Sequence, residues 1–166
     1  MFEMELLKNM LPSSGAGVDN ELPPLNPGAR WVPEDDEFIA QLRQQYFQDQ
    51  LPRVRVKTST QRFGQPTQEL AFTYKNGDPN IYVNAGTDVY RKAKSGDQDA
   101  RQYVAGVLAH ERAHLSPDNF NQGEAPAYTA QLDFLKKIGA GERLFARIKR
   151  TRDQELERER ISRSQR

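Results

Sequence analysis

Residues 97–115 read DQDARQYVAGVLAHERAHL, and this stretch decides the fold. Its apolar residues recur at helical spacing, so the sequence predicts one long helix with a buried stripe. Ser95 or Asp97 caps the start of this helix, and Ser116-Pro117 ends it near Leu115. The stripe consists of Ala100, Tyr103, Val104, Val107, Leu108 and Leu115.

The segments before this helix predict a small sheet and two further helices. A Pro–acid start favours a helix over about Pro33–Gln48. Arg53–Thr58 alternates as a half-buried strand does, with Val54 and Val56 inward. The sequence also predicts strands at Leu70–Tyr74 and Asn80–Asn84 around an Asn-Gly turn, and a short helix at Asp88–Lys94.

The segments after the long helix predict two more helices. One runs from Glu124 or Pro126 to Lys137 and is ended by Gly139, and the other is the charged C-terminus. The resulting order of elements predicts an α+β fold, in which a small three-stranded sheet packs on the helix over 97–115 and on the helix that follows it.

Composition divides the chain of 166 residues into three parts. Residues 1–33 are rich in Pro, Gly, Ser and Asn, which predicts a flexible N-terminal arm. Residues 34–140 hold the predicted core elements, and residues 141–166 form a charged C-terminal helix or tail. The mean hydropathy of −0.86 fits a chain with solvated segments at its ends.

The net charge of +1 hides an uneven distribution. Residues 1–37 carry eight acidic residues against two basic ones, whereas residues 141–166 carry nine basic residues against five acidic ones. In the C-terminal segment the opposite charges lie three or four residues apart. This pattern is typical of a solvated helix and argues against a nucleic-acid contact.

Cysteine is absent, which excludes disulfides, thiolate metal ligands and thiol nucleophiles. No apolar run approaches the length of a membrane span. Residues 1–11 hold a short apolar pattern, but Glu3 and Glu5 come first and no basic segment precedes them, which argues against a secretory signal. The expected location is the cytoplasm, with export through a removed leader as the alternative. The sequence leaves the oligomeric state open.

Both histidines of the chain lie in His110-Glu111-Arg112-Ala113-His114, an H-E-x-x-H motif inside the predicted helix. Their spacing puts both imidazoles on one face, where two nitrogens can reach one metal ion. Glu111 points to an adjacent side and can take a proton from a zinc-bound water during attack on a carbonyl. Chance produces such a match with odds of roughly one in a thousand. The alternative is that the motif only lies on the solvent-exposed surface of the helix. Its position between Leu108 and Leu115 argues against this alternative, because unpaired polar groups are costly in an apolar environment.

A catalytic zinc site normally has three protein ligands and one open position. With no cysteine and no third histidine, the third ligand must be a carboxylate, and the candidates are Asp118, Glu124 and Asp133. Glu124 fits best, because it begins the next helix and the loop 115–123 can fold that helix back across the first. The alternative is that Glu124 only complements the helix dipole. The expected Zn²⁺ ligands are therefore His110, His114 and Glu124.

H-E-x-x-H followed by a helix that carries Glu-x-x-Ala resembles the gluzincin clan of zinc metallopeptidases, particularly its small members called minigluzincins. The order of elements is similar over residues 34–138, and residues 110–137 carry the specific motif. The resemblance implies a zincin-like catalytic domain over 34–140 that hydrolyses peptide bonds. It also implies that an edge strand, here Ile81–Val83 within Asn80–Asn84, aligns an extended peptide or protein substrate.

The chain departs from the gluzincin pattern in one respect. Many gluzincins add a downstream His or Tyr that stabilises the oxyanion, and no histidine is left for this role. Tyr128, one helical turn beyond Glu124, is the candidate catalytic residue for oxyanion stabilisation. The alternative is that Tyr128 is a core aromatic residue that packs on Leu132.

Two other functions stay open from the sequence. One is a zinc-dependent amidase or other hydrolase that acts on a non-peptide amide or a cell-wall peptide, since the same water-activating site serves both. The other is a non-catalytic zinc-containing binding domain. Glu111 counts against this second function, because a structural zinc site needs no general base.

Overall fold

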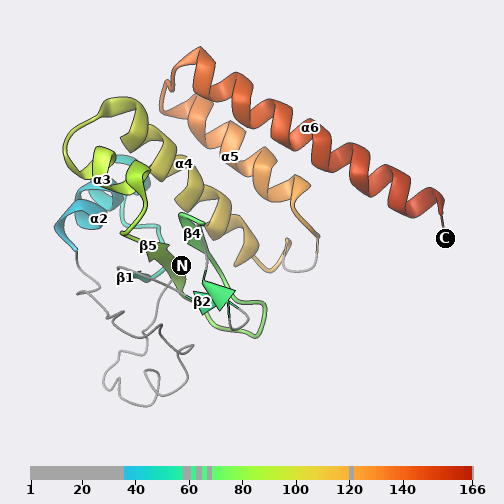
Figure 1. The fold of residues 1–166 in the computed structure, drawn as a ribbon, viewed down its shortest axis with the longest axis horizontal. Helices are drawn as coiled ribbons and strands as arrows, with labels where there is room; N and C mark the ends of the chain where they lie inside the picture. The colour runs from blue at the N-terminus through green and yellow to red at the C-terminus, as the bar shows by residue number, and fades with distance from the viewer. Residues whose placement is uncertain (1–35, 58–60, 63–64, 67–68, 120–121, 166) are drawn as a thin grey trace.

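The protein is described here by a computed structural model, which covers residues 36–57, 61–62, 65–66, 69–119 and 122–165 (Figure 1). The predicted arm over 1–33 lies outside the described residues. The helices are α2 (Glu37–Leu42), the π-helix η1 (Arg43–Phe47), α3 (Asp88–Lys94), α4 (Gln98–His114), α5 (Ala125–Lys137) and α6 (Glu142–Ser164). The strands are β1 (Val54–Lys57), β2 (Gln61–Arg62), β3 (Gln65–Pro66), β4 (Ala71–Phe72) and β5 (Ile81–Asn84).

The main sheet has three strands in the order β1-β5-β4. Strand β1 runs parallel to β5, with Val54 opposite Ile81, whereas β4 and β5 are antiparallel, with Ala71 opposite Val83. Strands β2 and β3 form a separate two-stranded pair. The predicted α+β fold with a small three-stranded sheet packed on helices is confirmed.

The position of β5 overturns one expectation. The sequence places Ile81–Val83 at a sheet edge, but β5 lies in the centre of the sheet with a strand paired on either side. All four residues of β5 are buried. The expectation is wrong because β1, from an earlier part of the chain, pairs in parallel with β5, and a parallel pairing leaves no turn signal in the sequence. A substrate peptide therefore cannot align on Ile81–Val83 by adding a strand.

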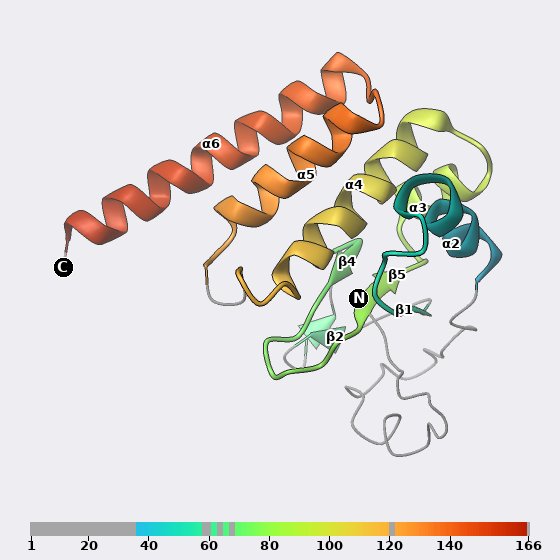
Figure 2. The ribbon, with the colours of Figure 1, turned by 180° about the vertical axis from the view of Figure 1, so that it is seen from behind.

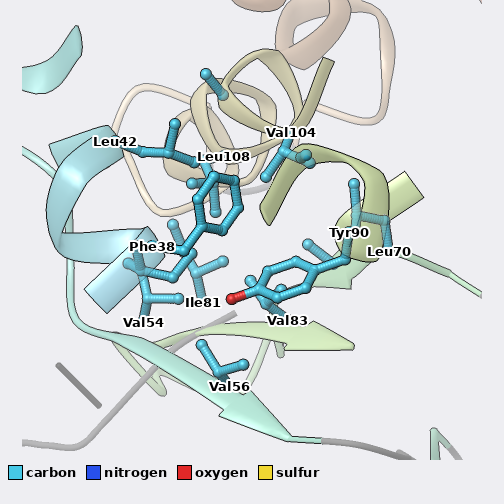
Figure 3. Close-up of a cluster of buried hydrophobic side chains, with 14 of the residues drawn as sticks. Phe38, Leu42, Val54, Val56, Leu70, Ile81, Val83, Tyr90, Val104 and Leu108 are labelled. Carbon is cyan, nitrogen blue, oxygen red and sulfur yellow. The ribbon is translucent and has the colours of Figure 1, made fainter. Parts of the chain in front are cut away.

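One face of the sheet packs against α2, α3 and α4 (Figure 3). The buried side chains of this core include Phe38, Leu42, Val54, Val56, Ile81, Val83, Tyr90, Val104 and Leu108. The predicted inward direction of Val54 and Val56 is thus confirmed. The predicted half-burial of this strand is wrong, because Arg55 and Lys57 are buried as well. Burial lowers the pKa of Lys57 to about 7.

The first described helix begins with a side-chain cap and changes from an α-helix to a π-helix. Asp36 accepts hydrogen bonds from the backbone N–H groups of Phe38 and Ile39, which satisfies two donors at the start of α2. The helix predicted over Pro33–Gln48 continues as the π-helix η1 and ends at Gln48, whose φ is 48°. Residues 33–35 of that prediction lie outside the described residues.

Helices α3 and α4 begin and end close to the predicted residues. Thr87 caps α3, and the Asp97 carboxylate accepts a 2.8 Å hydrogen bond from the backbone N–H of Ala100 at the start of α4. Helix α4 ends at His114, directly before Leu115 and the predicted Ser-Pro stop. The core members of its predicted stripe are buried, namely Ala100, Val104 and Leu108.

Helices α5 and α6 extend the fold on the side of α4 away from the sheet (Figures 1 and 2). Helix α5 packs against both α4 and α6. Leu132, Leu135 and Ile148 form a second, smaller core between α5 and α6. Helix α6 extends beyond the end of α5, so its last turns lie far from the sheet. In the described part of the chain, no helix is both long and apolar enough to cross a membrane.

Gly106 lets α5 pack tightly against α4. A Cβ atom at this position would lie 3.0 Å from Leu135 Cδ2 and 3.3 Å from Gln131 Nε2. Larger side chains at such a contact must push their neighbours aside. Because Gly106 lies one helical turn before His110, this contact sets the spacing of the two helices next to the histidines.

We expect the substitution Gly106→Val to lower the free energy of unfolding by about 1–3 kcal/mol, because the branched side chain overpacks the contact with Leu135 and Gln131. Urea denaturation measures this change. Arg112→Val is the matched control on the same helix, since Arg112 is exposed and its replacement costs only about 0.5 kcal/mol in helix propensity. Equal stabilities of the two variants would contradict the close packing of α4 on α5.

Candidate metal centre

The last turns of α4 place two imidazole rings side by side. His110 and His114 are four residues apart, and their ring centroids lie 4.9 Å apart. Their Nε2 atoms are 3.2 Å from each other. Both residues are buried, with 7% and 8% of their surface exposed. The predicted convergence of two imidazole nitrogens on one face of the helix is therefore present in the structure.

Glu124 reaches the two histidines from the start of α5. Gly123 precedes it with a φ of 82°, a left-handed conformation that favours glycine and turns the chain into the helix. Glu124 occupies the N-cap position but makes no side-chain hydrogen bond to the helix that follows. Instead its carboxylate oxygens lie 3.2 Å from His110 Nε2 and 3.5 Å from His114 Nε2.

The spacing of these three groups fits a tetrahedral metal ion. Zinc bonds to imidazole nitrogen and carboxylate oxygen are about 2.0–2.2 Å long, and a tetrahedron of that size has edges of about 3.3 Å. The observed separations are 3.2, 3.2 and 3.5 Å. His110, His114 and Glu124 form the one group of potential metal ligands found among the described residues. Three corners of a tetrahedral site are therefore in place.

The charge of the group also suits a cation. Hydrogen bonds from the His110 and His114 imidazoles hold the pKa of the Glu124 carboxyl well below its usual range. The carboxylate is therefore ionised at neutral pH, and its negative charge lies directly against two imidazole nitrogens. An ionised carboxylate and two imidazoles are typical zinc ligands, although several divalent ions accept the same set.

The structure separates Glu124 from the other two carboxylates considered as third ligands. Asp118 and Asp133 are both exposed, and neither joins the group formed by the two histidines and Glu124. Asp118 lies in the turn after α4, and Asp133 lies on the solvent side of α5. Of the three candidates, only Glu124 lies where a metal ion would meet the histidines.

Glu111 faces a pocket next to the histidines. Glu111 and His110 line a pocket of about 580 Å³ together with residues of α4, of the β4 region and of the start of α3. Glu111 itself is buried, with 8% of its surface exposed. It is not one of the three grouped ligands, and it contributes to the pocket wall beside His110.

Tyr128 lies against His110. The ring centroids of these residues are 4.4 Å apart, with an angle of 67° between the planes. Burial, and then the negative charge of Glu124, raise the pKa of Tyr128, so its hydroxyl stays protonated at neutral pH. Tyr128 also packs at the margin of the Leu132 and Leu135 cluster. The predicted role in oxyanion stabilisation stays a prediction.

Two residues of the predicted buried stripe also belong to the pocket. Tyr103 and Val107 pack against the core as predicted, but both are partly exposed and line the pocket beside His110 and Glu111. They lie seven and three residues before His110, and such spacing places them on the same side of a helix. That spacing was the signal in the sequence that could have identified them as site residues.

Comparison with protein-family models, with curated proteins and with solved structures found no match for this chain. The gluzincin resemblance thus stands on the motif and on the geometry alone. Fold and site together define an α+β protein with a candidate metal centre formed by two histidines and one glutamate.

Proposed function

We propose that the protein is a zinc-dependent metallopeptidase in which His110, His114 and Glu124 hold the ion and Glu111 is the general base. The observation behind this proposal is the triangle of ligand atoms with separations of 3.2, 3.2 and 3.5 Å. These residues come from two different helices, so the triangle results from the tertiary fold and not from the motif alone.

The site has the features of a catalytic zinc centre more than those of a structural one. Structural zinc is usually enclosed by four protein ligands, whereas catalytic zinc keeps an open position beside three. Three ligands come together here, and one of them, His110, also lines the neighbouring pocket. This arrangement favours a hydrolase over a non-catalytic zinc-containing domain.

The position of Glu111 supports its proposed role as the base. A zinc ion held at this site would supply Lewis acidity and lower the pKa of a bound water. Glu111 follows His110 directly in α4, and both side chains line the same pocket. Its carboxylate can accept a proton on the pocket side and return it to the leaving amine as the amide bond breaks.

The pocket supports a peptide as the substrate. Its walls include the apolar side chains of Leu70, Val89 and Val107 and the ring of Tyr103, which suit a side chain of a polypeptide. Leu70 and Ala71 belong to the wall at the outer strand β4, so a bound chain would lie beside the sheet. Within this proposal residues 34–140 form the catalytic unit, with the 1–33 arm and α6 as additions to it.

Metal analysis followed by a substrate screen tests the proposal. We expect the purified full chain to contain one zinc ion, and to cleave unfolded proteins or peptide libraries. A chelator should abolish this cleavage, and added zinc should restore it. A screen of non-peptide amides and cell-wall peptides runs in parallel, and cleavage of these alone would indicate an amidase. A chain that binds no zinc at micromolar concentration would exclude both hydrolases.

A further inference from the structure

One nitrogen of the candidate metal centre has no hydrogen bond to a protein group of the described residues. A histidine that binds metal through one ring nitrogen normally donates its other N–H to a carboxylate, a carbonyl or a water, and this hydrogen bond fixes the ring orientation. His110 Nδ1 is buried and has no hydrogen-bond partner among the described residues. Among the described residues, the protein groups that contact this imidazole meet its Nε2 atom or its ring.

Two aromatic rings contact the imidazole ring of His110. The ring of Tyr128 meets the His110 ring at a centroid distance of 4.4 Å, and the His114 ring meets it at 4.9 Å. Both contacts have steep interplanar angles, 67° and 72°, which is the favourable edge-to-face arrangement of aromatic rings. The imidazole of His110 is thus in contact with one ring from α5 and one ring from α4.

Tyr128 is well placed for this task because it shares its helix with Glu124. The two residues are four apart on α5, so they lie on one face about one turn from each other. Glu124 meets the Nε2 atom of His110, while Tyr128 meets its ring. Tyr128 in turn packs on the cluster of Leu132, Leu135 and Ile148, which joins α5 to α6.

We propose that Tyr128 is a positioning residue, whose ring fixes the imidazole plane of His110 so that Nε2 points toward His114 and Glu124. This inference rests on the proposed metal centre and adds a residue to it. The aromatic ring carries this role, whereas the hydroxyl group does not. In this respect the inference differs from oxyanion stabilisation, which requires the hydroxyl.

Two substitutions separate the ring from the hydroxyl. Tyr128→Phe keeps the ring and should leave the zinc dissociation constant within about twofold of the wild-type value. Tyr128→Leu removes the ring and should weaken zinc binding by about 10–100-fold, the range seen when the support of a ligating histidine is lost. Chelator competition measures both constants. The Co²⁺ absorption spectrum should change in Tyr128→Leu alone.

Phe134→Leu is the matched control for the loss of an aromatic ring from α5. Phe134 stacks on Phe47 with ring centroids 4.8 Å apart, and neither residue belongs to the candidate ligand group. This variant should lose stability yet bind zinc as the wild type does. Because the chain has only two histidines, imidazole NMR signals of the metal-free protein give a second readout. The His110 signals should shift in Tyr128→Leu and stay in place in Tyr128→Phe.

Unchanged zinc affinity and unchanged His110 signals in Tyr128→Leu would overturn the inference while leaving the peptidase proposal intact. Equal weakening of zinc binding in Tyr128→Phe and Tyr128→Leu would also overturn it, because the hydroxyl group and not the ring would then carry the role. A wild-type chain that binds no zinc would overturn the metal centre itself, and this outcome is recognised before any variants are compared.

Discussion

Replacement of Glu111 by Gln is expected to lower kcat/KM for peptide hydrolysis by about 10²–10⁴-fold, which is the usual contribution of a general base. Gln is nearly isosteric with Glu but cannot accept a proton at neutral pH. Glu111 lies outside the group formed by His110, His114 and Glu124. The zinc dissociation constant should therefore stay within about threefold of wild type, since the ligands are unchanged.

Steady-state cleavage of a peptide found in the substrate screen measures the effect, with zinc content determined on the same samples. Glu142→Gln provides the control, because Glu142 is exposed in the first turn of α6. This control should cleave at the wild-type rate. If the Glu111 variant cleaved as fast as the wild type, Glu111 would not be the base, and another group would have to accept the proton.

The second large effect concerns the metal ligands. We expect His114→Ala to weaken zinc binding on the order of 100-fold or more. The free energy of zinc binding is about 10 kcal/mol or above, and each ligand supplies roughly a quarter to a third of it. Glu124→Gln should also weaken binding, since the amide carries no charge. Zinc at 100 times its dissociation constant stabilises the wild type by about 2.7 kcal/mol. A variant that binds 100-fold more weakly keeps only about 0.4 kcal/mol of this increment at the same zinc concentration.

Chelator competition gives the affinities, and thermal unfolding with and without zinc gives the stabilisation. Asp118→Asn is the control for Glu124→Gln, because both remove a carboxylate charge close to the H-E-x-x-H motif but Asp118 is exposed and outside the ligand group. The control should bind zinc as the wild type does. Equal losses in the two variants would mean that Glu124 is not the third ligand.

Local signals were enough to predict the helices that form the site. Asp97 and the Ser116-Pro117 pair bracket α4, and the chain adopts that helix within one residue of the expected end. Elimination reduced the third ligand to a carboxylate, because the chain has no cysteine and only two histidines. The position of Glu124 at the start of the next helix then selected it from three candidates. The candidate metal centre was therefore more predictable than the sheet.

The remaining features depend on contacts between distant residues. The parallel pairing of β1 with β5 joins segments more than 20 residues apart, and no turn motif in the sequence predicts this pairing. The burial of Arg55 and Lys57 could not be read from an alternating pattern, which normally predicts one solvated face. The contact of Tyr128 with His110 depends on the crossing of α4 and α5, which Gly106 permits.

The ligands described above come from the end of one helix and the start of the next, and this arrangement has a mechanical consequence. An ion bound by His114 and Glu124 would tie together the two ends of the intervening loop, as a disulfide does in an oxidised protein. A chain without cysteine would thereby gain a removable cross-link. Loss of the ion would release α5, and α6 with it, so the metal-free protein would become easier for proteases to digest.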